Sequence, residues 1–360
     1  SQREALAYFG RDEIYMERYL TKPRHVEVQV LCDQHGNAVY LGTRDCSAQR
    51  RHQKLIEEAP AFDIPESILK AMGEAAVAVA KGCDYVNAGT VEFLYENEEF
   101  YYLEMNTRLQ VEHPVTEMVT GVDLVEQQLR VAFGEELSIR QEDVEIAGHA
   151  IEVRINAEDP AEGKFLPSPG RLTTFKASAG FGTRWDGGYE EGDEISQFYD
   201  NLVGKLICWG KDRKTAIART IRALEEFEIA GLSTTIPADL AILRHPDFQD
   251  NKHSTKWVEE GLDLTGVKGS PLENTEAGSG SVIRTTEVEV DGKRFSVSMS
   301  VPSGKSQIRR SASATGASAS GGDGKITVPM QGTIVKIQVA VGDKVQSGDI
   351  LLVLEAMKME

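Results

Sequence analysis

The sequence predicts an α+β protein made of several consecutive units, and three observations lead to this prediction. Strands and helices are mixed along residues 1–133, and again along residues 149–262. Residues 303–324 are rich in Ser, Ala and Gly, a composition typical of a flexible tether. Short strands with Gly-Asp turns then follow in residues 325–360, so we expect a small β unit there.

Hydrophobic periodicity predicts the main elements of the first unit. The stretch "RHVEVQVL" alternates polar residues with valine, which indicates a half-buried strand. The stretch "TVEFLYENEEFYYLEMN" predicts two strands around a polar turn. A helix is expected between Pro65 and Gly82, and a second helix is expected to end at Gly134.

The second unit and the segment after it show equally clear patterns. "HAIEVRINAEDP" alternates like a strand, and "RKTAIARTIRALEEF" has the spacing of an amphipathic helix. We assign residues 263–324 to a linker. Within it, Asp291-Gly292 predicts the turn of a short β-hairpin at residues 282–303.

Composition excludes several classes of protein. The formal net charge of −18 argues against binding to nucleic acid or to an anionic membrane. No apolar run reaches the roughly 18 residues that a bilayer span needs, and no signal peptide is visible. The four cysteines are scattered, so we expect reduced thiols in a cytoplasmic protein rather than disulfides or a zinc site.

The hairpin near residue 98 suggests a metal site. If its turn is centred on Glu98, Glu92 and Glu104 face each other across the strands, and Asn106 lies on the same face. Like charges at facing positions destabilise a sheet unless a cation lies between them, and carboxylate oxygens suit Mg²⁺. The alternative is an ordinary solvated acidic face.

The stretch "NTRLQVEHP" extends the same face if it is also a strand. It would then point Asn106, Arg108, Gln110 and Glu112 to one side. An arginine can bind a small oxyanion with two hydrogen bonds, and Glu112 could take a proton from that anion. The alternative is an exposed polar strand.

Basic residues gather in "RDCSAQRRHQK", although the chain as a whole is acidic. This local reversal of charge favours an anion such as phosphate, and the alternative is a surface loop paired with carboxylates. The residues concerned are Arg44, Arg50, Arg51, His52 and Lys54. Further along, Arg154 shares a strand face with Glu152, and its pattern alone indicates a structural ion pair.

Lys358 lies between two methionines at the end of the small β unit. Methionine is usually buried, and lysine is unfavourable in a strand, so this lysine is presented rather than packed. Together with the tether, this predicts an attachment site on a mobile module. The alternative is an ordinary surface lysine near a chain end.

Two stretches of the chain resemble biotin-dependent carboxylases. "EAMKM" resembles the biotin-attachment motif of biotin carboxyl carrier domains, with Lys358 as the modified lysine, and "VPMQGTIVKIQVAVGDKVQSGD" is similar to the first half of that hammerhead fold. Residues 1–262 resemble biotin carboxylase, an ATP-grasp enzyme. The matching stretches, in order, are "YMERYL", "PRHVEVQV", "RDCSAQRRHQK", "EMNTRLQVEHPVTE", "INAEDP", "FLPSPG" and "GKLI".

The resemblance implies the α chain of an acyl-CoA carboxylase that uses biotin, ATP and Mg²⁺ or Mn²⁺. Bicarbonate would be phosphorylated by ATP, and the resulting carboxyphosphate would supply CO₂ to biotin. The implied domains are a partial ATP-grasp domain at 1–133, a biotin carboxylase C-terminal domain at 149–262 and the first part of a biotinyl carrier at 325–360.

The resemblance also implies roles for single residues. Glu17, Arg18, Tyr19 and Leu20 would hold adenine, with further ATP contacts from His25, Gln49, His52, Glu92 and Glu104. The metal ligands would be Glu92, Glu104 and Asn106. Bicarbonate would bind Lys54, Arg108, Gln110, Val111 and Glu112. The catalytic residues would be Arg108, Glu112 as the base, and Arg154, which would stabilise the biotin enolate.

The expected partners are a carboxyltransferase β subunit, a biotin protein ligase, an acyl-CoA acceptor and further copies of the chain. Relative to the family pattern, the sequence lacks the glycine-rich lid and the later carrier strands, so we expect a fragment that is inactive alone. Two other classes stay open: a different ATP-grasp ligase and a non-catalytic carrier. Acetyl-CoA and propionyl-CoA are the favoured acceptors, ahead of pyruvate and urea.

Overall fold

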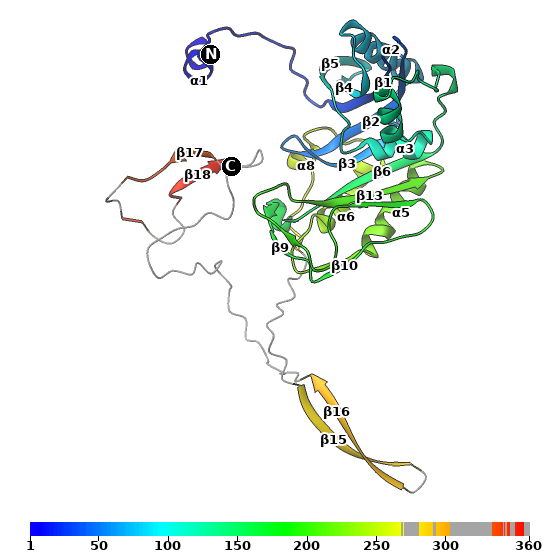
Figure 1. Cartoon of the computed structure of the whole chain (residues 1–360). Helices are drawn as coiled ribbons and strands as arrows, with labels where there is room; N and C mark the ends of the chain where they lie inside the picture. The colour runs from blue at the N-terminus through cyan, green and yellow to red at the C-terminus, as the bar shows by residue number, and fades with distance from the viewer. Residues whose placement is uncertain are drawn as a thin grey trace.

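The computed structural model describes residues 1–267, 269, 281–290, 293–302, 333–340, 342, 344–345 and 350–355 (Figure 1). Lys358 and the tether predicted at 303–324 therefore lie outside the described residues.

One eight-stranded sheet forms the centre of the described part between residues 24 and 210 (Figure 1). Its strands are β1 (Arg24–Cys32), β2 (Ala38–Arg50), β3 (Gln53–Ala59), β4 (Asn87–Glu96), β5 (Glu99–Asn106), β6 (His149–Asn156), β11 (Thr183–Gly187) and β13 (Leu202–Gly210). They lie in the order β11-β13-β6-β3-β2-β1-β4-β5, and all neighbours are antiparallel. Strand β6 pairs directly with β3, so the two units that the sequence suggests share a single sheet.

Helices α2 (Glu66–Gly82) and α5 (Arg213–Glu225) pack on this sheet, as do α3 (His113–Thr120) and α4 (Leu124–Ala132). The other helices are α1 (Gln2–Phe9), which lies apart from the sheet (Figure 1), α6 (Ile236–Arg244), α7 (Pro246–Gln249) and α8 (Trp257–Glu260), with 3₁₀ turns η1 (Gln141–Asp143) and η2 (Ala161–Gly163). The helices predicted at 65–82, before Gly134 and from Arg213 are confirmed as α2, α4 and α5.

Side-chain alternation assigns each helix to a face. On β1, Val30 packs in the core under α2, whereas the adjacent Leu31 packs with Leu124 of α4. On β6, Ile151 packs in the core under α5, whereas Ala150 packs under α3. Helices α2 and α5 therefore share one face, and α3 and α4 share the other.

The prediction of a half-buried β1 was wrong. Glu27 and Gln29, on its polar side, are fully buried, as are its valines. The polar side chains of this strand are covered because Arg44 of β2 lies against them and donates to Glu27 and Gln29. Thr116 of α3 in turn accepts a hydrogen bond from the buried guanidinium of Arg44.

Short two-stranded sheets complete the described fold. They pair β7 (Glu158–Asp159) with β8 (Leu166–Pro167), β9 (Gly170–Arg171) with β12 (Glu194–Ile195), and β10 (Thr174–Lys176) with β14 (Glu228–Ala230). Strands β15 (Ser281–Val290) and β16 (Lys293–Pro302) form a hairpin in the segment where the sequence predicts one. In the carrier region the described strands are β17 (Thr333–Ile337) and β18 (Leu352–Glu355), which pair with each other.

Gly73 lets α2 approach the sheet closely. A Cβ atom added at Gly73 would lie 2.5 Å from Cε2 of Tyr40 on β2, a distance that a methyl group cannot occupy. The ring is wedged between helix and strand, so the helix or the ring would have to shift. Gly82 in the same helix has no heavy atom within 4 Å of such a Cβ.

We predict that Gly73→Ala lowers the free energy of unfolding by about 1–3 kcal/mol, the usual cost of overpacking a core. Gly82→Ala is the matched control, and its effect should lie between zero and about 1 kcal/mol of stabilisation because alanine favours helix. Urea-induced unfolding followed by circular dichroism measures both. Equal effects of the two substitutions would contradict the close contact with Tyr40.

Candidate active site

A row of charged side chains crosses the sheet on the face covered by α3 and α4. Glu104 on β5 is the cross-strand partner of Glu92 on β4, and Glu92 is the partner of Glu27 on β1. Glu27 in turn faces Arg44 on β2. Three carboxylates thus lie side by side, an arrangement that is unfavourable unless cations lie among them.

The pairing of Glu92 with Glu104, predicted from the sequence, depends on a β-bulge. The hairpin turn is centred between Asn97 and Glu98, both with positive φ, rather than on Glu98. That turn alone would place Leu103 opposite Glu92. The register shifts by one residue at Leu103, which restores Glu104 to the position facing Glu92.

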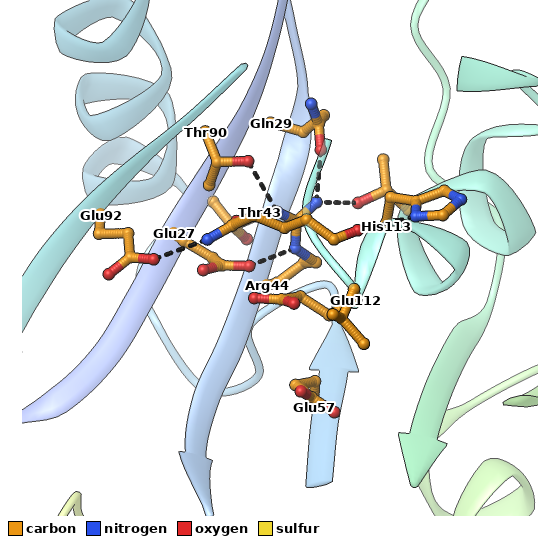
Figure 2. Close-up of polar contacts among 12 residues, drawn as sticks. Glu27, Gln29, Thr43, Arg44, Glu57, Thr90, Glu92, Glu112 and His113 are labelled. Carbon is orange, nitrogen blue, oxygen red and sulfur yellow. Dashed lines mark hydrogen bonds and ion pairs between the residues drawn. The ribbon is translucent and has the colours of Figure 1, made fainter. Parts of the chain in front are cut away.

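Arg44 neutralises the middle of the row from a fully buried position. Its Nε donates to Glu27 Oε1 at 2.5 Å, and its two terminal nitrogens donate to four uncharged acceptors (Figure 2). These are Gln29, Thr90, Gln110 and Thr116, at 2.7–3.0 Å. All five guanidinium donors therefore have acceptors, which a buried arginine requires. Burial alone would raise the pKa of Glu27, but Arg44 and Lys54 lower it to about 2.

Lys54 on β3 reaches into the same cluster. Its ammonium group contacts Glu27 at 2.7 Å and Glu92 at 3.3 Å, and it also donates to Glu112. Burial would lower the pKa of Lys54, but Cys46, Glu27 and Glu112 around it raise the pKa above its usual value. The lysine thus stays charged and connects the carboxylate row to Glu112.

Glu112 lies at the N-cap of α3 and is 2% exposed. One carboxylate oxygen accepts from Lys54, and the other accepts from Arg154 Nη2 at 2.9 Å. Arg154 comes from β6, and its Nε also donates to Glu57 Oε1 at 2.6 Å. Cations from β3 and β6 therefore hold Glu112 from two sides, close to Glu27 and Glu57 (Figure 2).

Glu92 is the second centre of the cluster. Its Oε1 accepts from Gln110 at 2.8 Å and from Asn106 at 3.0 Å, while His25 Nε2 lies 2.9 Å from Oε2. Burial would raise the pKa of Glu92, but His25 beside it and the charge of Lys54 lower it to about 2. The carboxylate is therefore ionised at neutral pH.

Glu92, Glu104 and Asn106 form an oxygen-rich group at the open end of the row. Asn106 Nδ2 lies 3.0 Å from Glu92 Oε1 and 3.4 Å from Glu104 Oε1. Glu104 is exposed, and no salt bridge pairs it with a cation in the described part of the chain. Hard oxygen ligands beside an unneutralised carboxylate fit Mg²⁺ or Mn²⁺.

The segment expected to hold adenine lies beside the β4–β5 hairpin. Arg18 Nη1 contacts Glu99 Oε2 at 3.2 Å and also donates to Tyr101 of β5. Tyr19 is largely exposed and receives a hydrogen bond from Lys256. Glu17 is exposed and Leu20 is buried.

Other predicted residues are not brought into the cluster. Residues 107–112 do not continue β5 as a strand, because the chain turns at 111–112 to enter α3. Arg108 consequently points to solvent and donates to the carbonyl of Leu109. Val111 contributes its carbonyl, which accepts from Lys205 at 2.8 Å.

The five basic residues of the expected cluster lie in three different places. Arg44 and Lys54 point into the buried network, whereas Arg51 and His52 form the exposed β2–β3 turn, with φ of 47° and 62°. Arg50 stacks on Phe165 instead, with its guanidinium carbon 4.8 Å from the ring centre. Gln49 is buried on β2, where it faces Lys54 across the strands.

Sequence reasoning missed Glu27 and Glu57 as members of the site. The only signal for Glu27 was its place in an alternating strand, which did not reveal that this side of the strand would be covered.

Lys358 lies outside the described residues. The four cysteines are all unpaired, as expected. No helix in the described part of the chain combines the length and apolar character that a bilayer span requires.

Comparisons with known proteins identify the family. Residues 1–140 match the family "Carbamoyl-phosphate synthase L chain, ATP binding domain", residues 152–260 match "Biotin carboxylase C-terminal domain", and residues 324–360 match "Biotin-requiring enzyme". The chain belongs to the biotin-dependent carboxylase family. It combines the ATP-grasp and C-terminal parts of a biotin carboxylase with a biotin/lipoyl-type domain.

Relatives within this family match most of the chain. The biotin-dependent acyl-coenzyme A carboxylase alpha3 subunit of Mycobacterium leprae is 45% identical over 381 residues, covering 99% of this chain and 62% of that protein. The biotin carboxylase of Haemophilus influenzae is 50% identical and covers 73% of this chain and 58% of that protein. The chain thus spans about six-tenths of the length of these relatives.

Solved structures of the family share the fold. The biotin carboxylase domain of Hydrogenobacter thermophilus 2-oxoglutarate carboxylase, solved with MgADP, ADP and bicarbonate, is 46% identical with a TM-score of 0.68. The match covers 72% of this chain and 57% of that one. The biotin carboxylase of Campylobacter jejuni, solved with an ATP compound, is 45% identical with a TM-score of 0.67 over 71% of this chain and 57% of that one.

We predict that Arg44→Met lowers the free energy of unfolding by about 3–5 kcal/mol, because it leaves Glu27 buried with one cation fewer. Adding Glu27→Gln should recover part of this loss, with a coupling energy of about 1–3 kcal/mol. Urea unfolding of the two single variants and the double variant measures it.

The control is Arg51→Met, in the exposed turn of the same hairpin, which should change stability by less than about 0.5 kcal/mol. If Arg44→Met lowered the free energy of unfolding no more than Arg51→Met does, the stabilising role of Arg44 in the site would be contradicted.

Proposed function

We propose that the protein containing this chain uses ATP and bicarbonate to carboxylate biotin. This is the first half-reaction of an acetyl-CoA or propionyl-CoA carboxylase, and the biotin would be carried on the same chain. The observation that carries the proposal is the clamp on Glu112, whose two oxygens are held by Lys54 and Arg154 beside the carboxylates Glu92 and Glu104. Family membership supports it, since relatives named biotin carboxylase or acyl-coenzyme A carboxylase share this part of the chain.

Each group has a role in phosphoryl transfer to bicarbonate. Lys54 supplies positive charge for bicarbonate next to Glu112. Glu112 takes the proton of the bicarbonate hydroxyl as a bicarbonate oxygen attacks the γ-phosphorus of ATP and ADP leaves. Arg154 holds the other oxygen of Glu112 and would stabilise the biotin enolate. Arg44 donates to the side-chain oxygen of Gln110, and the side-chain nitrogen of Gln110 donates to Glu92. The amide is therefore fixed beside the position proposed for bicarbonate. These residues act mainly through positioning and charge, as phosphoryl transfer requires.

Glu92, Glu104 and Asn106 would hold Mg²⁺ or Mn²⁺, which supplies positive charge to the phosphate oxygens of ATP. The segment from Glu17 to Leu20, with His25, Gln49 and His52, is assigned to ATP. Gln110, Val111, Arg108 and Lys54 are assigned to bicarbonate. Because Arg108 donates to Leu109 here, its role requires that the side chain turn toward the anion.

The second half-reaction would need other proteins. We infer a carboxyltransferase β subunit that passes the carboxyl group to an acyl-CoA, a biotin protein ligase that modifies Lys358, and further copies of this chain. The unpaired cysteines fit a reducing compartment, which supports the cytoplasm.

We predict that Glu104→Gln in the intact protein removes nearly all bicarbonate-dependent ATP hydrolysis, a loss of several kcal/mol of transition-state stabilisation. Folding should be little affected because Glu104 is exposed and its described hydrogen bond, from Asn106, is long at 3.4 Å. ADP release at saturating Mg²⁺, with and without bicarbonate, measures the effect.

Glu98→Gln, at the exposed tip of the same hairpin, is the matched control and should retain the activity of the unsubstituted protein. Normal turnover in Glu104→Gln would refute the assignment of this carboxylate to the metal.

We also predict that the intact protein carries biotin on Lys358 alone. Co-expression with a biotin ligase, followed by a streptavidin blot and mass spectrometry of peptides, tests this. Lys358→Arg should abolish the signal, whereas Lys344→Arg, at an exposed lysine of the same region, should keep it. Biotin on any other lysine would overturn the carrier assignment.

A further inference from the structure

Two acidic side chains next to Glu112 are fully buried and short of partners. Glu57 on β3 and Glu152 on β6 are cross-strand partners, and both have no solvent exposure. Glu57 Oε1 accepts from Arg154. Glu57 Oε2 and both carboxyl oxygens of Glu152 are buried without any hydrogen-bond partner. In Figure 2, Glu57 lies below Glu112.

The charges that face Glu152 do not neutralise it. They are Glu57 from β3, Arg154 from its own strand, Lys205 from β13 and Glu112 from the turn before α3, where His113 begins the helix. Arg154 is engaged by Glu57 and Glu112.

Lys205 donates to the carbonyl of Val111 and lies 3.7 Å from Asp186. No salt bridge reaches Glu152 from any described residue. Two facing, buried carboxyl groups, of which only Glu57 is paired with a cation, cannot both be ionised without a large penalty.

We propose that Glu152 and Glu57 retain one proton between them, carried by Glu152 with Glu57 Oε2 as its acceptor. This neutralised pair keeps Arg154 directed at Glu112. Both residues are then positioning residues for the base, acting through Arg154. This part of the inference rests on the proposed function, whereas the shared proton does not.

The direction of the pKa values agrees with the geometry. Burial, followed by the charge of Glu57, raises the pKa of Glu152 well above its ordinary value. Burial also raises the pKa of Glu57, although Arg154 opposes that shift. The pKa of His113 is lowered, chiefly by burial, so His113 adds no fixed positive charge at neutral pH.

A proton retained in the fold makes stability depend on pH. A carboxyl group whose pKa is raised by folding stabilises the protein below its unfolded pKa. That stability is lost as the pH rises toward the folded pKa. Across this window the unfolding equilibrium constant of the unsubstituted protein should rise about tenfold per pH unit relative to Glu152→Gln. Glutamine mimics the protonated acid and has no proton to lose.

Infrared spectroscopy of the intact protein detects the proton directly. A protonated carboxyl group has a carbonyl stretch separate from the carboxylate band. The unsubstituted protein at neutral pH should show such a band, and Glu152→Gln should lose part of its intensity. The control is Asp239→Asn on α6, because Asp239 is also buried without partners and its pKa is also raised by burial. It should lose a different component and leave that of Glu152 in place.

Kinetics test the positioning role. The upper limb of the pH profile for bicarbonate-dependent ATP hydrolysis should move to higher pH in Glu152→Gln and stay in place in Asp239→Asn. Glu57→Gln removes the charge that holds Arg154, so it should lower kcat by about tenfold or more while the KM for ATP stays unchanged.

Identical infrared spectra and unfolding slopes for Glu152→Gln and the unsubstituted protein would overturn the shared proton. An unmoved pH profile with the band lost would overturn the positioning role alone. Absence of bicarbonate-dependent hydrolysis in the unsubstituted protein would overturn the proposed function. The band and the unfolding slopes would still decide the shared proton.

Discussion

Facing carboxylates on β5, β4 and β1 would repel one another if cations did not lie among them, and the site is arranged around this constraint. Arg44 saturates all five of its donors from beneath α3, and Lys54 enters from the neighbouring strand to bind three carboxylates. Removing such charges from water costs free energy, and only contacts of good geometry offset that cost. The same two cations also fix Gln110 and Glu112, so charge compensation in itself places the groups that we propose for bicarbonate chemistry.

Much of the fold could be predicted from local pattern. Helices α2, α4 and α5 have clear periodicity and end signals, and they lie where expected. The burial of β1 could not be predicted, because alternation reveals two faces and not what covers them. Residues 107–112 were misjudged for a related reason. Polar alternation after β5 resembled a strand, but Pro114 at the start of α3 and the N-cap at Glu112 turn the chain into a helix.

The candidate site was recoverable in part. Glu92, Glu104 and Asn106 lie on one hairpin, so their proximity follows from strand pairing, although the bulge at Leu103 that sets the register leaves no mark in the sequence. Glu27, Arg44, Glu57 and Glu152 come from four different strands. Their proximity depends on the strand order of the sheet, which a single sequence does not contain.

The pairing of β3 with β6 has a consequence for the evolution of such proteins. Neighbouring residues Glu57 and Glu58 of β3 point to opposite faces, and each binds an arginine contributed from beyond residue 149. Arg154 holds the first and Arg213 the second, where His149 adds a further contact. Recombination at this boundary would therefore break two buried ion pairs at once. Such a break would leave Glu57 and Glu58 buried without their arginines, so the parts of the chain on either side of it are expected to be inherited as one unit.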